Sequence, residues 1–299
     1  MGISLYKIGK WYKMLTGQSI SHIHQGVGYY YSKSELKGYY NDLTEKVTKD
    51  DEDILVPQYY VDSGEKIYFS IGIFQYGLAA YDLYLKSRDS NYLKKVMACA
   101  DWAISNQNDD GSWVTFAYKK DNHPFSSMAQ AEGISLLVRV AQLTHDEKYE
   151  ISAKQALDFM LKPVEEGGTT LYKNREIYFL ESTAMSPILN GWIFSIWGLY
   201  DFWLYFQGKR EKNILDETIK TLEIHLKDYD LKYWSKYNIS GNTASPFYHE
   251  LHIAQLKVMY DLTEEKIFED YALKFQKYQS NWIGKKHAFL KKAIEKIIE

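Results

Sequence analysis

Residues 189–206 read LNGWIFSIWGLYDFWLYF, and Asn190 and Asp201 are the only strongly polar residues among them. An apolar run of about 18 residues is just long enough to cross a membrane. A helix that is apolar all round is also what the interior of a large helical protein requires. The choice between these two interpretations depends on whether similar helices recur elsewhere in the chain.

The same arrangement recurs along the chain in four copies. Each copy has an apolar helix with a small polar island, then a polar turn, then a second helix with apolar residues three and four positions apart. The copies cover residues 73–104, 128–159, 189–226 and 248–278. Serial helix pairs of this kind close into a toroid or stack into a solenoid, and the apolar first helices favour a toroid that has them inside. The sequence therefore predicts a mainly α protein, an (α/α) barrel of about four helical hairpins, with residues 189–206 as a buried inner helix.

The first 70 residues have a different character. Tyrosine-rich segments at residues 29–31, 39–40 and 58–61 are typical of short strands or extended chain, and the charged run 49–53 separates them. We expect residues 1–70 to form an extended or β arm packed on the helical domain, and residues 71–299 to form the barrel.

Composition excludes several classes of protein. The chain has 36 basic and 39 acidic residues and a net charge of −3, whereas proteins that bind nucleic acid usually carry a basic surplus.

The chain has one cysteine, Cys99, which lies in an apolar run. This position predicts an inert thiol in the core. Residues 1–18 lack the features of a secretory signal, so we expect a cytoplasmic protein without an integral membrane span. The sequence leaves open whether the protein forms a homodimer.

Several polar and aromatic residues are candidates for a ligand site. Loops rich in glycine and aromatic residues separate the hairpins and are expected to gather at one mouth of the barrel. Trp113 either stacks on a sugar ring at this mouth or fills the core. Gln75, Gln130 and Asn190 are the polar islands of inner helices and predict a polar, substrate-binding lumen. Glu181 precedes the third inner helix and is expected to project into the mouth.

The fourth inner helix carries a line of polar residues. Tyr248, His252 and Gln255 are spaced i, i+4 and i+7 and share one helix face. Burying such groups without partners costs about 1–3 kcal/mol each, so either a ligand or structural hydrogen bonds must satisfy them. His249 and His252 could bind a metal, but no carboxylate or third histidine completes a site, and none is expected.

At these residues the sequence resembles the C-terminal domain of the D-glucuronyl C5-epimerases, which convert glucuronic to iduronic acid in heparosan and heparan-type chains. The likeness lies in short segments that occur in family order: residues 74–78, 127–130 with 134–135 and 137–139, 189–191 with 198–201, and 248–249 with 252–253 and 255–256. The family's helical domain is an (α/α)4 barrel. The resemblance thus implies the fold that the hairpins predict independently.

The resemblance also implies roles for individual residues. Tyr248 matches a catalytic tyrosine directly before the fourth inner helix. Tyr233 and Lys236 match a loop tyrosine that is followed by arginine three residues later, with lysine replacing the arginine. Glu181 keeps one acid of a Glu-Glu-Tyr-Pro-like loop, and the tyrosine of that loop is missing here.

The expected function is C5 epimerisation of a uronic acid residue in an acidic polysaccharide, without a cofactor. Tyr248 would be one proton carrier, with Tyr233 or Glu181 opposite. Lys236, assisted by His249 or His252, would neutralise the substrate carboxylate. Alternatives are a polysaccharide lyase, a glycosidase with two opposed carboxylates, and a saccharide-binding protein without catalysis.

Overall fold

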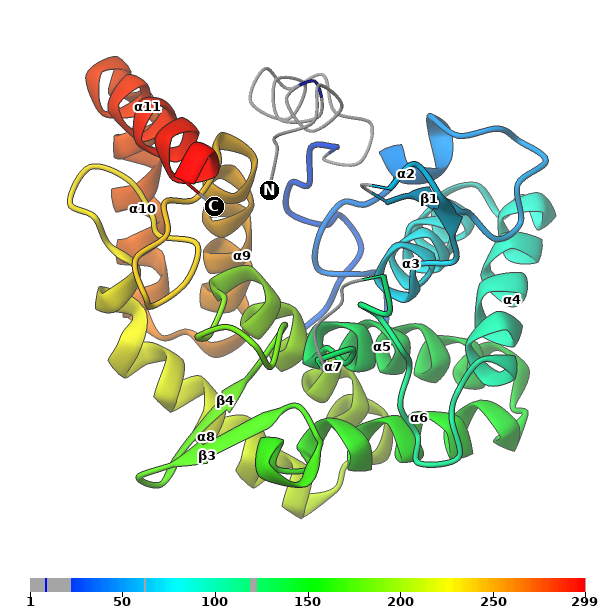
Figure 1. The fold of residues 1–299 in the computed structure, drawn as a ribbon. Helices are drawn as coiled ribbons and strands as arrows, with labels where there is room; N and C mark the ends of the chain where they lie inside the picture. Colours follow the sequence, from blue (N-terminus) through cyan, green and yellow to red (C-terminus); the bar gives the residue numbers. More distant parts are fainter. Residues whose placement is uncertain (1–8, 10–22, 62, 119–122, 299) are drawn as a thin grey trace.

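The computed structural model describes residues 9, 23–61, 63–118 and 123–298. Its core is a set of four helical hairpins in chain order (Figure 1). The first pairs α3 (Ser70–Ser87) with α4 (Ser90–Ser105), and the second pairs α5 (Ser127–Thr144) with α6 (Glu147–Leu161). The third pairs α7 (Leu189–Phe206) with α8 (Lys209–His225), and the fourth pairs α9 (Pro246–Thr263) with α10 (Lys266–Ser280). The predicted fold class, a mainly helical α/α toroid of four hairpins, is confirmed.

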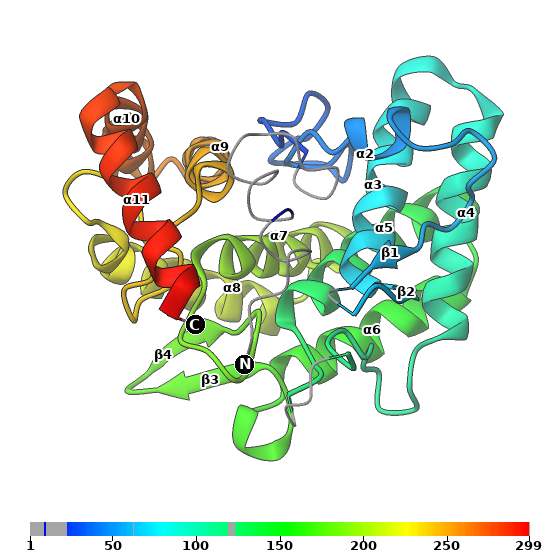
Figure 2. The same ribbon diagram turned by 45° about the horizontal axis from the view of Figure 1, so that its top comes forward.

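Smaller elements surround the hairpins. A short helix, α2 (Glu45–Thr48), and an antiparallel pair of two-residue strands, β1 (Tyr59–Tyr60) and β2 (Lys66–Ile67), precede α3 (Figure 2). A second antiparallel pair, β3 (Thr170–Lys173) and β4 (Glu176–Phe179), lies between the second and third hairpins. Two 3₁₀ turns, η1 (Val164–Glu166) and η2 (Leu226–Tyr229), and a final helix, α11 (Trp282–Ile298), complete the described elements.

The inner layer consists of α3, α5, α7 and α9, each packed against the next inner helix and against its own outer helix. Residues 189–202 of α7 are all buried, whereas α8 buries only Leu215, Thr218, Ile219, Thr221 and Leu222 along one side. This contrast places the apolar run in the inner layer, as the sequence predicts. Among the helices that the structure describes, none combines the length and apolarity required to cross a bilayer.

The four inner helices end in the same way. The residue after each helix, Arg88, His145, Gln207 or Glu264, has a left-handed backbone with φ between 56° and 62°. Its N–H donates to the carbonyl four residues earlier, which closes the helix in the manner of an αL cap. The outer helix starts within two or three residues. All tight turns therefore lie at one end of the barrel, and the long connecting loops gather at the other.

The N-terminal segment, defined here as residues 23–48, passes between α9 and α3 (Figures 1 and 2). On the α9 side, the Tyr31 hydroxyl donates to Asp261 at 2.5 Å, and Lys33 pairs with Glu264. On the α3 side, the Tyr39 N–H donates to the buried Asp82 at 3.0 Å. The segment therefore bridges the first and last hairpins.

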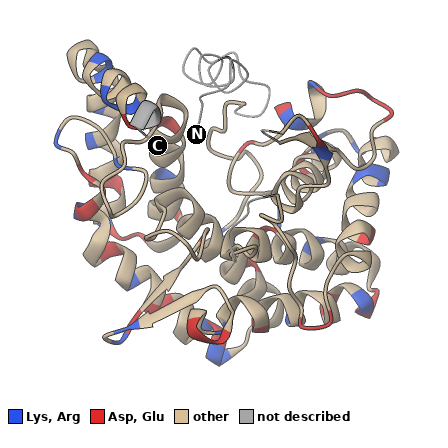
Figure 3. Ribbon diagram, viewed as in Figure 1, with Lys and Arg blue, Asp and Glu red and all other residues tan. Residues whose placement is uncertain are grey.

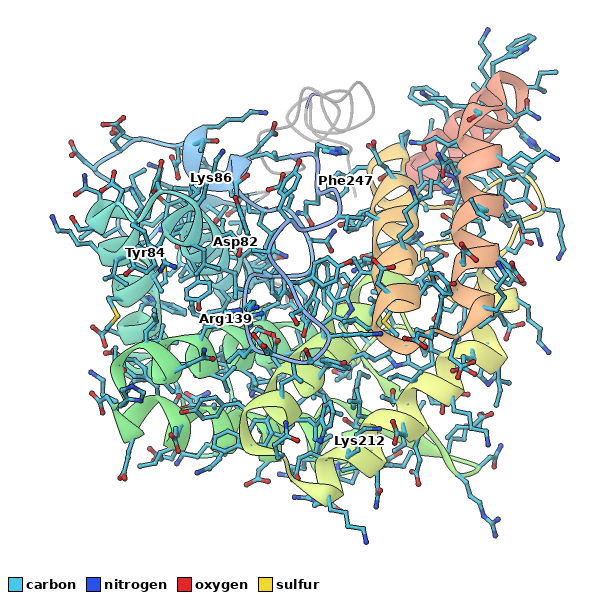
Figure 4. All side chains as sticks on the ribbon, turned by 180° about the vertical axis from the view of Figure 1, so that it is seen from behind. Asp82, Tyr84, Lys86, Arg139, Lys212 and Phe247 are labelled. Atoms are coloured by element: carbon cyan, nitrogen blue, oxygen red, sulfur yellow. The ribbon has the colours of Figure 1, made fainter. Side chains whose placement is uncertain are left out.

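A buried ion pair fixes this segment to the middle of the barrel. Arg139 on α5 binds Asp201 on α7 through two hydrogen bonds, of 2.6 and 3.2 Å. Its other N–H groups donate to the carbonyls of Lys37, Gly38 and Ser135, at 2.8, 2.9 and 2.8 Å. The Tyr40 hydroxyl donates to Asp201 as well, at 2.8 Å. Figure 4 shows Arg139 beside the N-terminal segment, which the pair joins to two inner helices.

Candidate functional site

A cavity of about 560 Å³ lies at the end of the barrel where the inner helices begin. It receives side chains from the first turns of the inner helices, from the β1–β2 region, and from the loops before α5 and α7. The lining residues include Lys46, Tyr59, Tyr60, Gln75, Phe116, Tyr118, Met128, Glu181, Asn190, Phe194, Phe247, Tyr248 and Leu251. Its volume is typical of small-ligand sites.

Tyr248 lines this cavity from the first turn of α9. Ser245 caps the helix by accepting a hydrogen bond from the Tyr248 N–H, and Pro246 occupies the first helical position; both residue types favour a helix start here. The Tyr248 ring lies 4.8 Å from the Tyr237 ring, centroid to centroid. Burial, followed by the negative charge of Glu181, raises the pKa of the Tyr248 phenol well above its usual value, so the phenol is protonated at neutral pH.

Glu181 reaches the same cavity from the segment between β4 and α7. Its carboxylate accepts a hydrogen bond from Asn190 Nδ2 at 3.1 Å and one from the Tyr237 hydroxyl at 3.4 Å. Gly191 allows this approach, because a β-carbon there would lie only 2.3 Å from Glu181 Oε2. Glu181, Tyr237 and Tyr248 thus form one polar cluster, supplied by three different parts of the chain.

The first-hairpin side of the cavity carries a cation. Lys46, half-buried in α2, lines the cavity together with Gln75 of α3. Burial lowers the pKa of Lys46 to about 8, against the opposing attraction of Glu132. Gln75 Nε2 donates to Glu132 Oε1 at 2.7 Å, while Glu132 Oε2 has no hydrogen-bond partner among the described residues. Lys46 thus lines the cavity, and behind Gln75 lies the carboxyl group of Glu132, whose pKa burial raises well above its usual value.

Aromatic side chains surround these charged groups. Tyr60 is 60% exposed and Tyr118 is 42% exposed, and Phe247 projects from the start of α9, as Figure 4 shows. All three line the cavity. Exposed aromatic faces beside polar groups are suited to the apolar faces of sugar rings.

Of the residues predicted from the sequence, the structure brings Gln75, Glu181, Asn190 and Tyr248 to the cavity. Trp113 is not at the mouth. It is 1% exposed, packs edge-to-face on Phe74 at 4.9 Å, and donates its indole N–H to the Ala103 carbonyl. The alternative interpretation of Trp113, as a core residue, is therefore correct.

Gln130 is also structural. Its side chain accepts a hydrogen bond from the Trp113 N–H and donates to the carbonyls of Gly111 and Ala156. It ties α5 to the outer layer and lies outside the cavity lining. Glu132, two residues later on α5, lies toward the lumen instead, where it accepts a hydrogen bond from Gln75.

His249 and His252 are buried and share one serine. Ser235 Oγ lies 2.8 Å from His249 Nδ1 and 2.9 Å from His252 Nδ1. His249 stacks on Trp234 and donates from Nε2 to the Phe275 carbonyl at 3.0 Å. Burial lowers the pKa of His249 to about 3 and that of His252 well below its usual value. Both rings are neutral and outside the cavity lining, so neither supplies the positive charge expected from the sequence.

Tyr233 and Lys236 do not line the cavity either. Tyr233 stacks on His287 of α11 at 4.5 Å, and Lys236 lies in an isolated bridge with Thr243. Tyr237, one residue beyond Lys236, is the loop tyrosine that reaches Glu181. Sequence reasoning missed both Tyr237 and Lys46. The three tyrosines between residues 233 and 248 could have indicated Tyr237 as a candidate. No sequence pattern indicates Lys46.

The fold and cavity together define an α/α barrel protein whose site combines a phenol, a carboxylate and an ammonium group within an aromatic rim. The family described as "D-glucuronyl C5-epimerase C-terminus" matches residues 107–277, more than half of the chain. The chain belongs to this family, which confirms the resemblance; three of the four inner-helix segments that carry it lie within the matched residues.

Individual relatives are more distant. A D-glucuronyl C5-epimerase of Caenorhabditis elegans is 28% identical over 225 residues, which cover 66% of this chain and 35% of that protein. The match thus spans about a third of the nematode enzyme. An uncharacterized protein of Methanocaldococcus jannaschii is 27% identical over 220 residues, covering 64% of this chain and 71% of its own length. A solved structure titled "Crystal structure of D-mannose isomerase" aligns with a TM-score of 0.47 at 13% identity, covering 73% of this chain and 64% of that one.

Proposed function

We propose that this protein epimerises C5 of a uronic acid residue within an acidic saccharide chain. The observation that carries the proposal is the convergence of Tyr248, Glu181 and Lys46 on one cavity. Membership of the epimerase family supports carbohydrate epimerisation as the class of reaction. The geometry supports a substrate that is both a sugar and an anion.

Lys46 is the proposed binding partner of the substrate carboxylate. The C5 proton is weakly acidic because the adjacent carboxylate is already negative, so the site must offset that charge as the enediolate-like intermediate forms. An ammonium group 4 Å from a carboxylate contributes about 4 kcal/mol at an effective dielectric constant of 20. Lys46 takes over the role that the sequence assigned to Lys236, because Lys46 lines the cavity and Lys236 does not.

Tyr248 and Glu181 are the proposed proton carriers. Inversion requires removal of the C5 proton on one face of the ring and delivery of a proton on the other, so C5 must lie between the two groups. Because the Tyr248 phenol is protonated at neutral pH, it is suited to donate, and the Glu181 carboxylate is suited to accept. Asn190 and the Tyr237 hydroxyl hold that carboxylate in place through their hydrogen bonds, which reduces the cost of orienting it for reaction.

The reaction is tested by incubating the protein with a glucuronate-containing heparosan-type polymer in deuterated water. We expect deuterium at C5 while the chain length stays unchanged. Tyr248→Phe should lower the exchange rate at least a hundredfold, the usual contribution of a general acid or base. Tyr233→Phe is the matched control, since it removes the same hydroxyl from the same region outside the cavity and should leave exchange intact.

Other products identify other functions. An unsaturated terminal sugar would show a lyase, which shares the C5 proton abstraction but expels the C4 oxygen. New reducing ends would show a glycosidase, and binding without any product would show a saccharide-binding protein. Any of these results, or full exchange by Tyr248→Phe, would disprove the proposal.

A further inference from the structure

The last helix, α11, is seated by specific contacts against the loop that carries Tyr237. Ala288 is 2% exposed and packs with Trp234 and Ala244. Glu295 accepts hydrogen bonds from the N–H and the hydroxyl of Thr243, the latter at 2.7 Å. These contacts bury one side of α11 and define which side faces outward.

The outward side of α11 is apolar. Trp282, Ile283, Leu290 and Ile294 are 65%, 62%, 61% and 56% exposed, and Phe289 is 37% exposed. At 100° per residue these positions fall on one continuous face of the helix. Five large apolar side chains gathered on one face differ from the scattered single residues that are normal on a protein surface. This face has the character of an interaction surface.

Lysines accompany the apolar residues. The sequence of α11 contains five lysines and one glutamate, although the whole chain carries a net charge of −3. One of these lysines, Lys292, is buried and pairs with the glutamate, Glu295, at 3.5 Å. Figure 3 shows basic residues along α11, while the rest of the ribbon carries both acidic and basic residues. Lys285 and Lys286 are exposed, and Lys286 lies within the apolar face, with its Nζ 4.9 Å from the centre of the Trp282 ring.

We propose that α11 binds the surface of an anionic lipid membrane. A helix with tryptophan and aliphatic residues on one face and lysines beside them lies in the headgroup region, where lysine stems follow the apolar layer and their ammonium groups reach phosphates. Anionic lipids complement the charge of α11. This inference is independent of the reaction proposed above.

Other partners fit this face less well. A second copy of the chain, docked through the same face, would bring the lysines of one helix against those of the other and bury Lys286 in an apolar contact, which is costly. A dissolved acidic polysaccharide would engage the lysines, but it has no use for the aliphatic side chains of Leu290 and Ile294. Only a surface that is both anionic and apolar uses both sets of residues.

The test is flotation of the full-length protein with phosphatidylcholine vesicles, either pure or containing about 30% phosphatidylglycerol. We expect binding to the anionic vesicles and its loss when salt is raised from about 0.05 to about 0.5 M, because salt screens exposed charges. Leu290→Ser should lower the partition constant about tenfold, whereas Leu273→Ser, 55% exposed on α10, should not change it. Lys285→Glu should weaken binding as well, with Lys277→Glu on α10 as its control.

Several outcomes would overturn the proposal. One is equal binding to neutral and anionic vesicles, and another is an equal loss in Leu290→Ser and Leu273→Ser. A dimer in sedimentation analysis that Leu290→Ser dissociates, without vesicle binding, would assign the face to a second copy. A drop of several degrees in the melting temperature of Leu290→Ser would mean that the chain itself covers the face.

Discussion

Replacing Lys46 by methionine separates recognition of the substrate's charge from recognition of its sugar ring. Methionine keeps most of the length and apolar volume of the lysine stem but removes the ammonium group. The attraction worked out above, about 4 kcal/mol at 4 Å, is an upper value because Lys46 is only half-buried. We expect a loss of about 3 kcal/mol, which is roughly a hundredfold in affinity, for a glucuronate-containing oligosaccharide.

The same change should not weaken the fold. Burial lowers the pKa of Lys46 from 10.5 to about 8, so holding the charge in this position costs the folded protein free energy at pH 7. The methionine variant removes that cost, although it also removes the cation that Glu132 faces. We therefore expect its free energy of unfolding to equal or exceed that of the wild type. Such gains are common when a residue kept for function, at a cost in stability, is replaced.

Titration calorimetry measures this prediction with two ligands: the glucuronate oligosaccharide, and the same chain with its carboxylates reduced to alcohols. Lys46→Met should lose affinity for the acidic ligand alone, and Lys236→Met should behave as wild type. Only the protonated amine attracts a carboxylate, so wild-type affinity for the acidic ligand should fall as pH rises through about 8. That pH dependence should vanish in Lys46→Met. Equal losses for both ligands, or none for the acidic one, would refute the reasoning.

Two further predictions concern the buried charges around the N-terminal segment. Arg139→Met leaves Asp201 charged, buried and unpaired, which should lower the free energy of unfolding by about 3–5 kcal/mol; urea denaturation checks this, and a loss under 1 kcal/mol would contradict it. Burial raises the pKa of Asp82 to about 7, so its carboxyl is protonated on folding, and the folded state loses up to about 4 kcal/mol relative to the unfolded state as pH rises from 4 to 8. Asp82→Asn should therefore gain stability relative to wild type over that range, and a constant difference between pH 4 and 8 would exclude this role.

The four hairpins could be predicted because burial imposes a pattern that is readable residue by residue. An inner helix such as α7 is apolar on every side, and an outer helix such as α8 has apolar residues on one side alone. The ends of the inner helices lack the glycine that usually marks a helix end. Arg88, His145, Gln207 and Glu264 close their helices in a conformation usually given to glycine, so the ordinary stop signal is absent.

The lumen-facing residues could not be separated from the structural ones by the same reasoning. Gln130 and Glu132 lie on the same inner helix and both are buried. Periodicity marks a polar residue on a buried helix but does not say whether it faces the lumen or the outer layer. Gln130 bonds to the outer layer and Glu132 to Gln75 of α3.

Which loop residues reach the cavity depends on contacts with distant parts of the chain, and the local sequence does not show these contacts. Tyr233 and Tyr237 lie four residues apart, yet one stacks on α11 and the other reaches Glu181. Lys46 enters the cavity because the N-terminal segment bridges α9 and α3, an arrangement that follows from the Arg139–Asp201 pair and its contacts with Lys37 and Gly38.

The bridge made by the N-terminal segment also governs the order of events during synthesis. Tyr31 and Asp261 are separated by 230 positions along the chain, so the N-terminal segment cannot take its final place until α9 has left the ribosome. Contacts between such distant positions form slowly. Until they form, the partly folded barrel exposes apolar surface that can aggregate. A chaperone that binds the partly folded barrel until the fourth hairpin has been synthesised would therefore raise the yield of folded protein.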